Sequence, residues 1–189
     1  EDQLQHLELT REIARRWNAR FGEYFPEPEP LISHAPRILG LDGASKMSKS
    51  AGNTIPLLAD DEELQATVGR AVTDPARIRR DDPGNPNVCN VYALHEHFSS
   101  PEERGEIEVR CQTAGLGCVA CKRRLASNVA EDLRPIRDRA RELKARPDRV
   151  REILEAGARR CRDIAGETLE EVYERMGLAR RRATAKPKG

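Results

Sequence analysis

The sequence lacks the features of a membrane-spanning or exported protein. Its 189 residues contain no apolar run longer than a few residues, whereas about 20 are needed to cross a bilayer. Charged residues make up 34% and the mean hydropathy is -0.73. The first residues, 1–6, include neither the basic nor the apolar segment of a secretory signal. We therefore expect a cytoplasmic protein without a membrane partner.

Internal repeats of fixed period are also missing, and the length is compatible with one large domain or two small ones. Charge is uneven although the net charge is +1. Residues 122–189 hold 20 Lys and Arg against 12 Asp and Glu, a surplus of +8 that leaves −7 for residues 1–121. A basic segment suits nucleic acid, but solvated Arg-rich helices produce the same pattern. Composition alone favours the solvated helices.

Helical periodicity dominates the chain. Apolar residues at a 3.6-residue spacing predict an amphipathic helix over residues 2–20, and a short apolar run predicts a buried strand over 37–41. Strand signals stop after this point. The later helix signals are the N-cap candidates Asp60, Ser100 and Asp148, the apolar period that starts at Cys118, and the terminator Gly177. The expected fold is mostly α: the edge of an α/β sheet followed by an all-α helical bundle.

Residues 42–53 are rich in Gly, Ser and Lys and carry groups suited to phosphate chemistry. Lys46 and Lys49 supply rotatable positive charges, and the serines beside them supply hydrogen-bond donors. We expect a mobile surface loop that can close over a ligand. Cations in such a loop stabilise the charge that grows on a leaving pyrophosphate. A solvated linker would have the same composition.

The order Lys46-Met47-Ser48-Lys49-Ser50 after a predicted strand resembles the signature loop of class I aminoacyl-tRNA synthetases. Four further segments, residues 1–10, 37–41, 71–74 and 133–136, are similar to the tryptophanyl-tRNA synthetases in particular. This resemblance implies activation of L-tryptophan by ATP with Mg²⁺, and transfer of the tryptophanyl group to tRNA(Trp). The alternatives are the sibling tyrosyl-tRNA synthetases and a non-catalytic, metal-stabilised helical module that binds tRNA.

The resemblance also implies a domain plan. Residues 1–53 would form the C-terminal part of a Rossmann-like catalytic domain, 54–180 a helical anticodon-binding domain, and 181–189 a basic disordered tail. The first half of the catalytic domain would be absent from this chain, so the active site would be incomplete. The full-length protein would be a homodimer. One lysine precedes Met47 where many relatives have two, which affects the reach of the loop.

Individual residues acquire expected roles from the same resemblance. Lys46, Ser48 and Lys49 would act on the phosphates during catalysis, with Ser50 beside them. Ile38 and Met47 would lie against the adenine. Glu1 and Asp2 would lie near the ATP ribose, and Gln3 near the amino acid. Contacts with tRNA would come from arginines of the helical part: Arg123, Arg124, Arg134, Arg137 and Arg139.

Four of the five cysteines, Cys89, Cys111, Cys118 and Cys121, follow the pattern C-x21-C-x6-C-x2-C. An odd number of cysteines in a chain without an export signal favours metal binding over disulfides. Four thiolates can hold Zn²⁺ or a [4Fe-4S] cluster, and the spacing does not separate the two. Some tryptophanyl-tRNA synthetases carry a [4Fe-4S] cluster on nearly this pattern, so the resemblance favours the cluster. Free buried thiols are the alternative.

Two other features have structural interpretations. His95 and His97 are expected at the surface, because positions i and i+2 of a helix face apart and cannot form a metal pair. Cys161 lies on an apolar helical face and is expected in the core.

Overall fold

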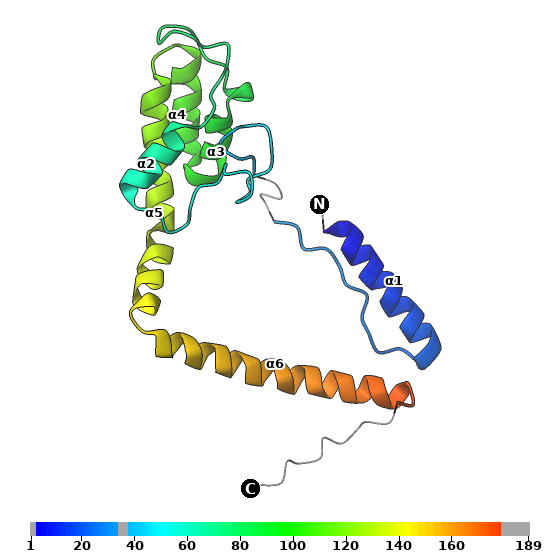
Figure 1. Ribbon diagram of the computed structural model, residues 1–189. Helices are drawn as coiled ribbons and strands as arrows, with labels where there is room; N and C mark the ends of the chain where they lie inside the picture. The colour runs from blue at the N-terminus through cyan, green and yellow to red at the C-terminus, as the bar shows by residue number, and fades with distance from the viewer. Residues whose placement is uncertain (1–2, 34–37, 179–189) are drawn as a thin grey trace. The chain divides into compact units, whose positions relative to one another are not determined.

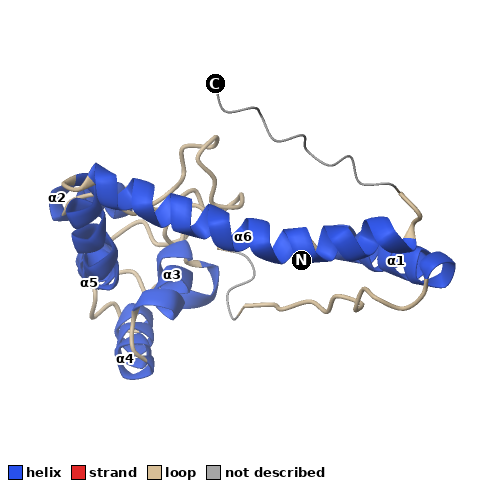
Figure 2. Cartoon of the chain, turned by 90° about the horizontal axis from the view of Figure 1, so that it is seen from below, coloured by secondary structure: helices blue, strands red, loops and turns tan. Residues whose placement is uncertain are grey.

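The computed structural model describes residues 3–33 and 38–178 (Figure 1). Its regular structure is helical, as Figure 2 shows, so the prediction of a mostly α chain is confirmed. The elements are α1 (Leu4–Phe21), α2 (Asp61–Gly69), the 3₁₀ turn η1 (Pro86–Val88), α3 (Asn90–Phe98), α4 (Pro101–Gln112), α5 (Cys118–Lys144) and α6 (Pro147–Arg175). None of the helices in the described part of the chain is long and apolar enough to cross a membrane.

The predicted strand over 37–41 is wrong for its described residues, 38–41. They form only an isolated antiparallel bridge between Leu39 and Lys46. A strand exists through its ladder of hydrogen bonds, and here the neighbouring backbone is the loop that follows. The Met47 N–H donates to the Ile38 carbonyl at 3.0 Å, and the Gly40 N–H donates to the Ser45 carbonyl at 2.8 Å. The segment is therefore the base of a loop.

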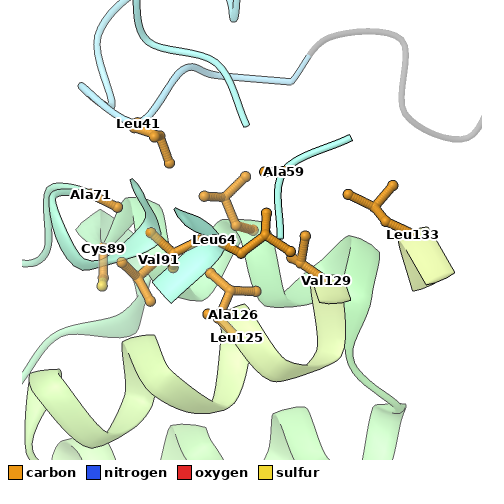
Figure 3. Close-up of a cluster of buried hydrophobic side chains, with 12 residues drawn as sticks. Leu41, Ala59, Leu64, Ala71, Cys89, Val91, Leu125, Ala126, Val129 and Leu133 are labelled. Atoms are coloured by element: carbon orange, nitrogen blue, oxygen red, sulfur yellow. The ribbon is translucent and has the colours of Figure 1, made fainter. Parts of the chain in front are cut away.

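The chain divides into two compact units, one formed by residues 33–145 and the other by 1–32 with 146–189. In the first unit, α5 packs against α2 and α3. Leu64 of α2, Val91 of α3, and Leu125 and Val129 of α5 are fully buried in one apolar core (Figure 3). Leu41 joins this core from the base of the loop. The predicted domain boundary at residue 53 stays a prediction, while residues 38–53 pack with the helices that follow them.

The caps of α2 and α4 are the predicted ones. The Asp60 carboxylate accepts from the Glu63 N–H at 2.8 Å, and the Ser100 hydroxyl accepts from the Glu103 N–H at 3.2 Å. Each side chain satisfies one of the N–H groups that a helix start leaves without an intrahelical partner.

The second unit contains α1, α6 and an aromatic cluster of Trp17, Phe21, Tyr24 and Phe25. The Arg175 guanidinium lies 4.9 Å from the Tyr24 ring centroid and donates to the Glu23 carbonyl at 3.0 Å. These contacts tie the C-terminal end of α6 to the turn that follows α1.

Helix α6 corrects two predictions. It has no buried residue, and Cys161 is exposed, because the described residues of this unit leave the neighbouring apolar side chains of Leu154 and Ile164 uncovered. Asp148 does not cap the helix: Pro147 is the first helical residue, and the Asp148 carboxylate pairs with Arg151 at 2.9 Å instead. The predicted terminator is confirmed, since Gly177 has φ +68° and lets the Leu178 N–H reach the Tyr173 carbonyl at 2.9 Å.

Candidate functional site

The Lys- and Ser-rich loop is organised around one buried side chain, Asn53. Its Nδ2 donates to Asp42 Oδ2 and Ser45 Oγ, both at 2.9 Å, and its Oδ1 accepts from the Ser48 N–H at 2.8 Å. The exposed fraction of Asn53 is 6%. Gly40 permits this packing, because a Cβ there would lie 2.0 Å from Asn53 Nδ2. Sequence reasoning missed Asn53, although a polar residue that closes a Gly- and Ser-rich loop is a typical hydrogen-bonding centre.

Asp42 is the acidic anchor of the loop. Its carboxylate accepts from the Ser45 hydroxyl at 2.7 Å and from the N–H groups of Ala44 and Ser45 at 3.1 and 3.2 Å. The hydrogen bond from Ser45 and then that from Asn53 hold the pKa of Asp42 well below its usual range. The base of the loop therefore keeps a negative charge at neutral pH, and the expected mobile loop is internally bonded at its base.

An open cavity of ≈ 890 Å³ lies beside the loop, and small-molecule sites in proteins measure about 300–1,000 Å³. It is lined by Ile38, Lys46, Met47, Ser48 and Lys49 and by residues 54–58. The structure thus brings five predicted site residues to one cavity. The wall formed by residues 54–58, with Leu57 and Leu58 half exposed, was not predicted.

Among the described residues of the loop motif 46–50, Ser50 does not line this cavity. Its Oγ lies 3.3 Å from Ser48 Oγ. Gln3 precedes α1 in the other unit. Glu1 and Asp2 lie outside the described residues.

The four patterned cysteines lie in one region of the first unit. Cys89 precedes α3, Cys111 belongs to α4, and Cys118 and Cys121 open α5. Burial raises the pKa of Cys121 to about 12, and the other three thiols add to this rise. All four cysteines are among the described residues, yet no group of three or more potential ligands there has the geometry of a bound metal ion.

Two side chains border these thiols. The Arg77 Nη1 lies 3.8 Å from Cys111 Sγ and donates to the Leu116 carbonyl at 2.9 Å. His95 Nε2 lies 3.5 Å from Cys121 Sγ, and its Nδ1 lies 2.6 Å from Ser99 Oγ. The expectation of a surface His95 is wrong, because His95 occupies the face of α3 that packs on α5 and is fully buried.

The arginines expected to contact RNA differ in availability. Arg137 is buried and donates to the carbonyls of Ala59 and Ala130 at 3.0 and 2.7 Å and to Asp61 at 2.7 Å, so it is a structural residue. Arg123 lines a cavity of ≈ 480 Å³ between residues 73–80 and the start of α5. The other three form ion pairs with acidic neighbours: Arg124 with Glu103 and Glu106, Arg134 with Glu131, and Arg139 with Glu142.

The sequence profile described as "tRNA synthetases class I (W and Y)" matches residues 1–134. Curated relatives named tryptophan–tRNA ligase include those of Deinococcus radiodurans, 48% identical over 94% of this chain and 54% of the relative, and Aquifex aeolicus, 46% identical over 94% and 45%. The chain spans about half the length of these relatives. The structure of tryptophanyl-tRNA synthetase from Campylobacter jejuni complexed with ADP and tryptophan matches with a TM-score of 0.77 and 32% identity, over 94% of this chain and 55% of that one.

Proposed function

The chain belongs to the tryptophan and tyrosine family of class I tRNA synthetases, and we propose that it forms the C-terminal part of a tryptophan–tRNA ligase. The full-length enzyme would convert tryptophan and ATP into tryptophanyl-adenylate and pyrophosphate, and then transfer the tryptophanyl group to tRNA(Trp). The observation that carries this proposal is the cavity that Ile38, Met47 and the two lysines line together. Tryptophan is favoured over tyrosine because the curated relatives at 45–48% identity are named tryptophan–tRNA ligase.

The lining of the cavity suits ATP. Ile38 and Met47 offer apolar surface for the adenine ring, and Lys46, Lys49 and Ser48 offer cations and a hydroxyl for the phosphates. The tryptophan carboxylate attacks the α-phosphorus, and the bond from that phosphorus to the pyrophosphate oxygen breaks. Negative charge grows on the departing pyrophosphate, where the lysines stabilise it. The reaction needs no general base, because the attacking carboxylate is already ionised.

The four-cysteine region is proposed to hold a [4Fe-4S] cluster, with Zn²⁺ as the alternative. Four neighbouring thiols form a donor set that fits either group. The group, when bound, would supply cross-links between the start of α3, α4 and the start of α5. Anaerobically purified protein should absorb broadly near about 400 nm. A colourless protein with one zinc per chain would show that the cysteines bind Zn²⁺ instead of a cluster.

Contact with the tRNA is proposed for the cavity beside Arg123. Arg77, Arg79 and Arg80 line it together with the exposed apolar side chains of Ile78 and Val119. Guanidinium planes and apolar surface are the groups on which unstacked RNA bases stack. A helical tRNA-binding protein without catalysis would share this surface, and homodimer formation of the full-length ligase is proposed from the family alone.

Pyrophosphate exchange by the full-length ligase tests the activity. Exchange should depend on tryptophan and not on tyrosine. Lys49→Ala should lower kcat about 10²-fold, because it removes a cation that acts on the departing charge. Lys144→Ala, an exposed lysine at the end of α5, is the matched control and should leave the rate unchanged. Exchange that depends on tyrosine would identify a tyrosyl-tRNA synthetase instead. Binding of tRNA without any exchange would indicate the non-catalytic tRNA-binding module.

A further inference from the structure

Asn90 connects the helical core to the base of the loop. It is the first residue of α3 and directly follows Cys89. Its side-chain Nδ2 donates to the Gly40 carbonyl at 2.8 Å, across 50 positions of sequence. The exposed fraction of Asn90 is 7%, so this hydrogen bond is shielded from water.

The Gly40 carbonyl is the point at which the loop turns. It also accepts from the Gly43 N–H at 2.9 Å, and Gly43 has φ +66°. A Cβ on Gly43 would lie 3.1 Å from Asn90 Cβ, so Asn90 packs closely on this turn. From the turn, Asp42 and Asn53 carry the hydrogen bonds on to Ser45 and Ser48. Asn90 is thus the only described side chain outside residues 38–53 with a hydrogen bond to the Gly40 carbonyl.

The amide of Asn90 has a cost that its hydrogen bond to Gly40 must offset. Its Oδ1 is buried without a hydrogen-bond partner, and a buried unpaired acceptor is destabilising. An apolar side chain of similar size would avoid this cost and lose only the bond to Gly40. The donor group, rather than stability of the core, therefore accounts for an asparagine at this position.

We propose that Asn90 is a positioning residue for ATP: by holding the Gly40–Gly43 turn, it sets where Lys46 and Lys49 lie along the cavity. The inference rests on the proposed function of the loop. It assigns no contact between Asn90 and substrate. Its effect should appear in the binding of ATP and not in the binding of tryptophan, because the hydrogen bonds at the base of the loop continue through Asn53 to the Ser48 N–H and the Lys46 carbonyl.

The test compares Asn90→Ala and the milder Asn90→Ser with Asn128→Ala. Asn128 lies on α5 in the same unit, and its amide donates to Ser99 Oγ and Glu103 Oε2, both at 2.7 Å, away from the loop. In the full-length ligase, both Asn90 variants should raise the KM for ATP about 5- to 10-fold, as expected for loss of one shielded hydrogen bond, and leave the KM for tryptophan unchanged. Asn128→Ala should lower the melting temperature without changing either KM.

A second measurement does not need activity. In the 189-residue chain, trypsin should cleave after Lys46 and Lys49 faster in the Asn90 variants than in the Asn128 variant or the unchanged chain, because the turn is released. If the unchanged ligase shows no exchange, the proposed function fails while the cleavage rates still test the role of Asn90. If the Asn90 variants change only the melting temperature, as Asn128→Ala does, the positioning role is wrong.

Discussion

Helices α5 and α6 are both long and amphipathic, but they use their apolar residues in opposite ways. On α5, Leu125 and Val129 are fully buried against α2 and α3. On α6, Leu154 and Ile164 are 66% and 58% exposed, and no residue of the helix is buried. Apolar periodicity predicts a helix in both places. It does not predict burial, which depends on the presence of a partner face.

The two helices should differ most in the stability lost when an apolar side chain is shortened to alanine. Leu125→Ala should lower the free energy of unfolding by about 3 kcal/mol, because it leaves a cavity in a fully buried site. Leu154→Ala on α6 should change it by less than about 0.5 kcal/mol. Urea unfolding of the 189-residue chain, followed by circular dichroism, measures both. A comparable loss in the two variants would mean that α6 is covered in solution and would remove the contrast.

The second-largest contrast is the stability lost when a buried arginine of α5 or an exposed arginine of α6 is replaced. Arg137→Met should cost about 2 kcal/mol, because the buried carbonyl of Ala59 and the part-buried carbonyl of Ala130 each lose a donor. Arg151→Met on α6 removes an exposed ion pair with Asp148 and should cost less than about 0.5 kcal/mol. The same unfolding measurement applies. Equal effects would show that the contacts of Arg137 contribute no more than a surface pair.

The helix starts give a smaller contrast. Asp60→Ala removes the cap of α2 and should cost about 1 kcal/mol. Asp148→Ala should cost only a few tenths of a kcal/mol, because this carboxylate lies inside the first turn of α6 and interacts with the helix dipole without capping an N–H. If Asp148→Ala lowers the free energy of unfolding as much as Asp60→Ala does, Asp148 caps α6 in solution, as the sequence pattern indicates.

Sequence patterns predicted correctly most of the features that depend on neighbouring residues in the chain. The caps at Asp60 and Ser100, the stop at Gly177 and the helices themselves follow from contacts within a few residues. Apart from the predicted cap at Asp148, the patterns failed where distant residues decide. Residues 38–41 pair with a loop and not with a strand, and His95 is buried because α5 covers it.

The same division holds for the candidate site. Residues 46–50 were recognisable from their order, and four of these five residues line the cavity. The part of its lining at 54–58 and Asn90 were not recognisable, whereas Asn53 closes a Gly- and Ser-rich loop and was overlooked. Asn90 reaches Gly40 across 50 positions, and no local pattern reports such a contact. Arg137 illustrates the converse: its charge suggested RNA binding, but its burial assigns it to the core.

The smallest expected contrast is between two carboxylates whose pKa values are both lowered. In the first unit, hydrogen bonds from Ser45 and Asn53 lower the pKa of Asp42; in the second, the hydrogen bond and charge of Arg15 lower that of Glu27. Each group therefore stabilises its fold above its ordinary pKa, and this contribution is lost as the pH falls through the folded pKa. Both carboxylates are at the surface, where solvent weakens their contribution to the free energy of unfolding. The contrast between them should therefore be measured in their pKa values and not in stability.

Salt should separate the two carboxylates. At about 1 M NaCl the Debye length is about 3 Å, so the attraction of Arg15 is screened and the pKa of Glu27 should rise toward its ordinary value. Asp42 should keep its low pKa, because its main donors are a neutral hydroxyl and a neutral amide. Carboxyl ¹³C titrations at about 0.01 M and about 1 M NaCl measure both values. Ser45→Ala should raise the pKa of Asp42 at either salt concentration. If salt raises both pKa values equally, long-range charge and not the hydrogen-bonded turn keeps Asp42 ionised, and the anchor at the base of the loop is electrostatic.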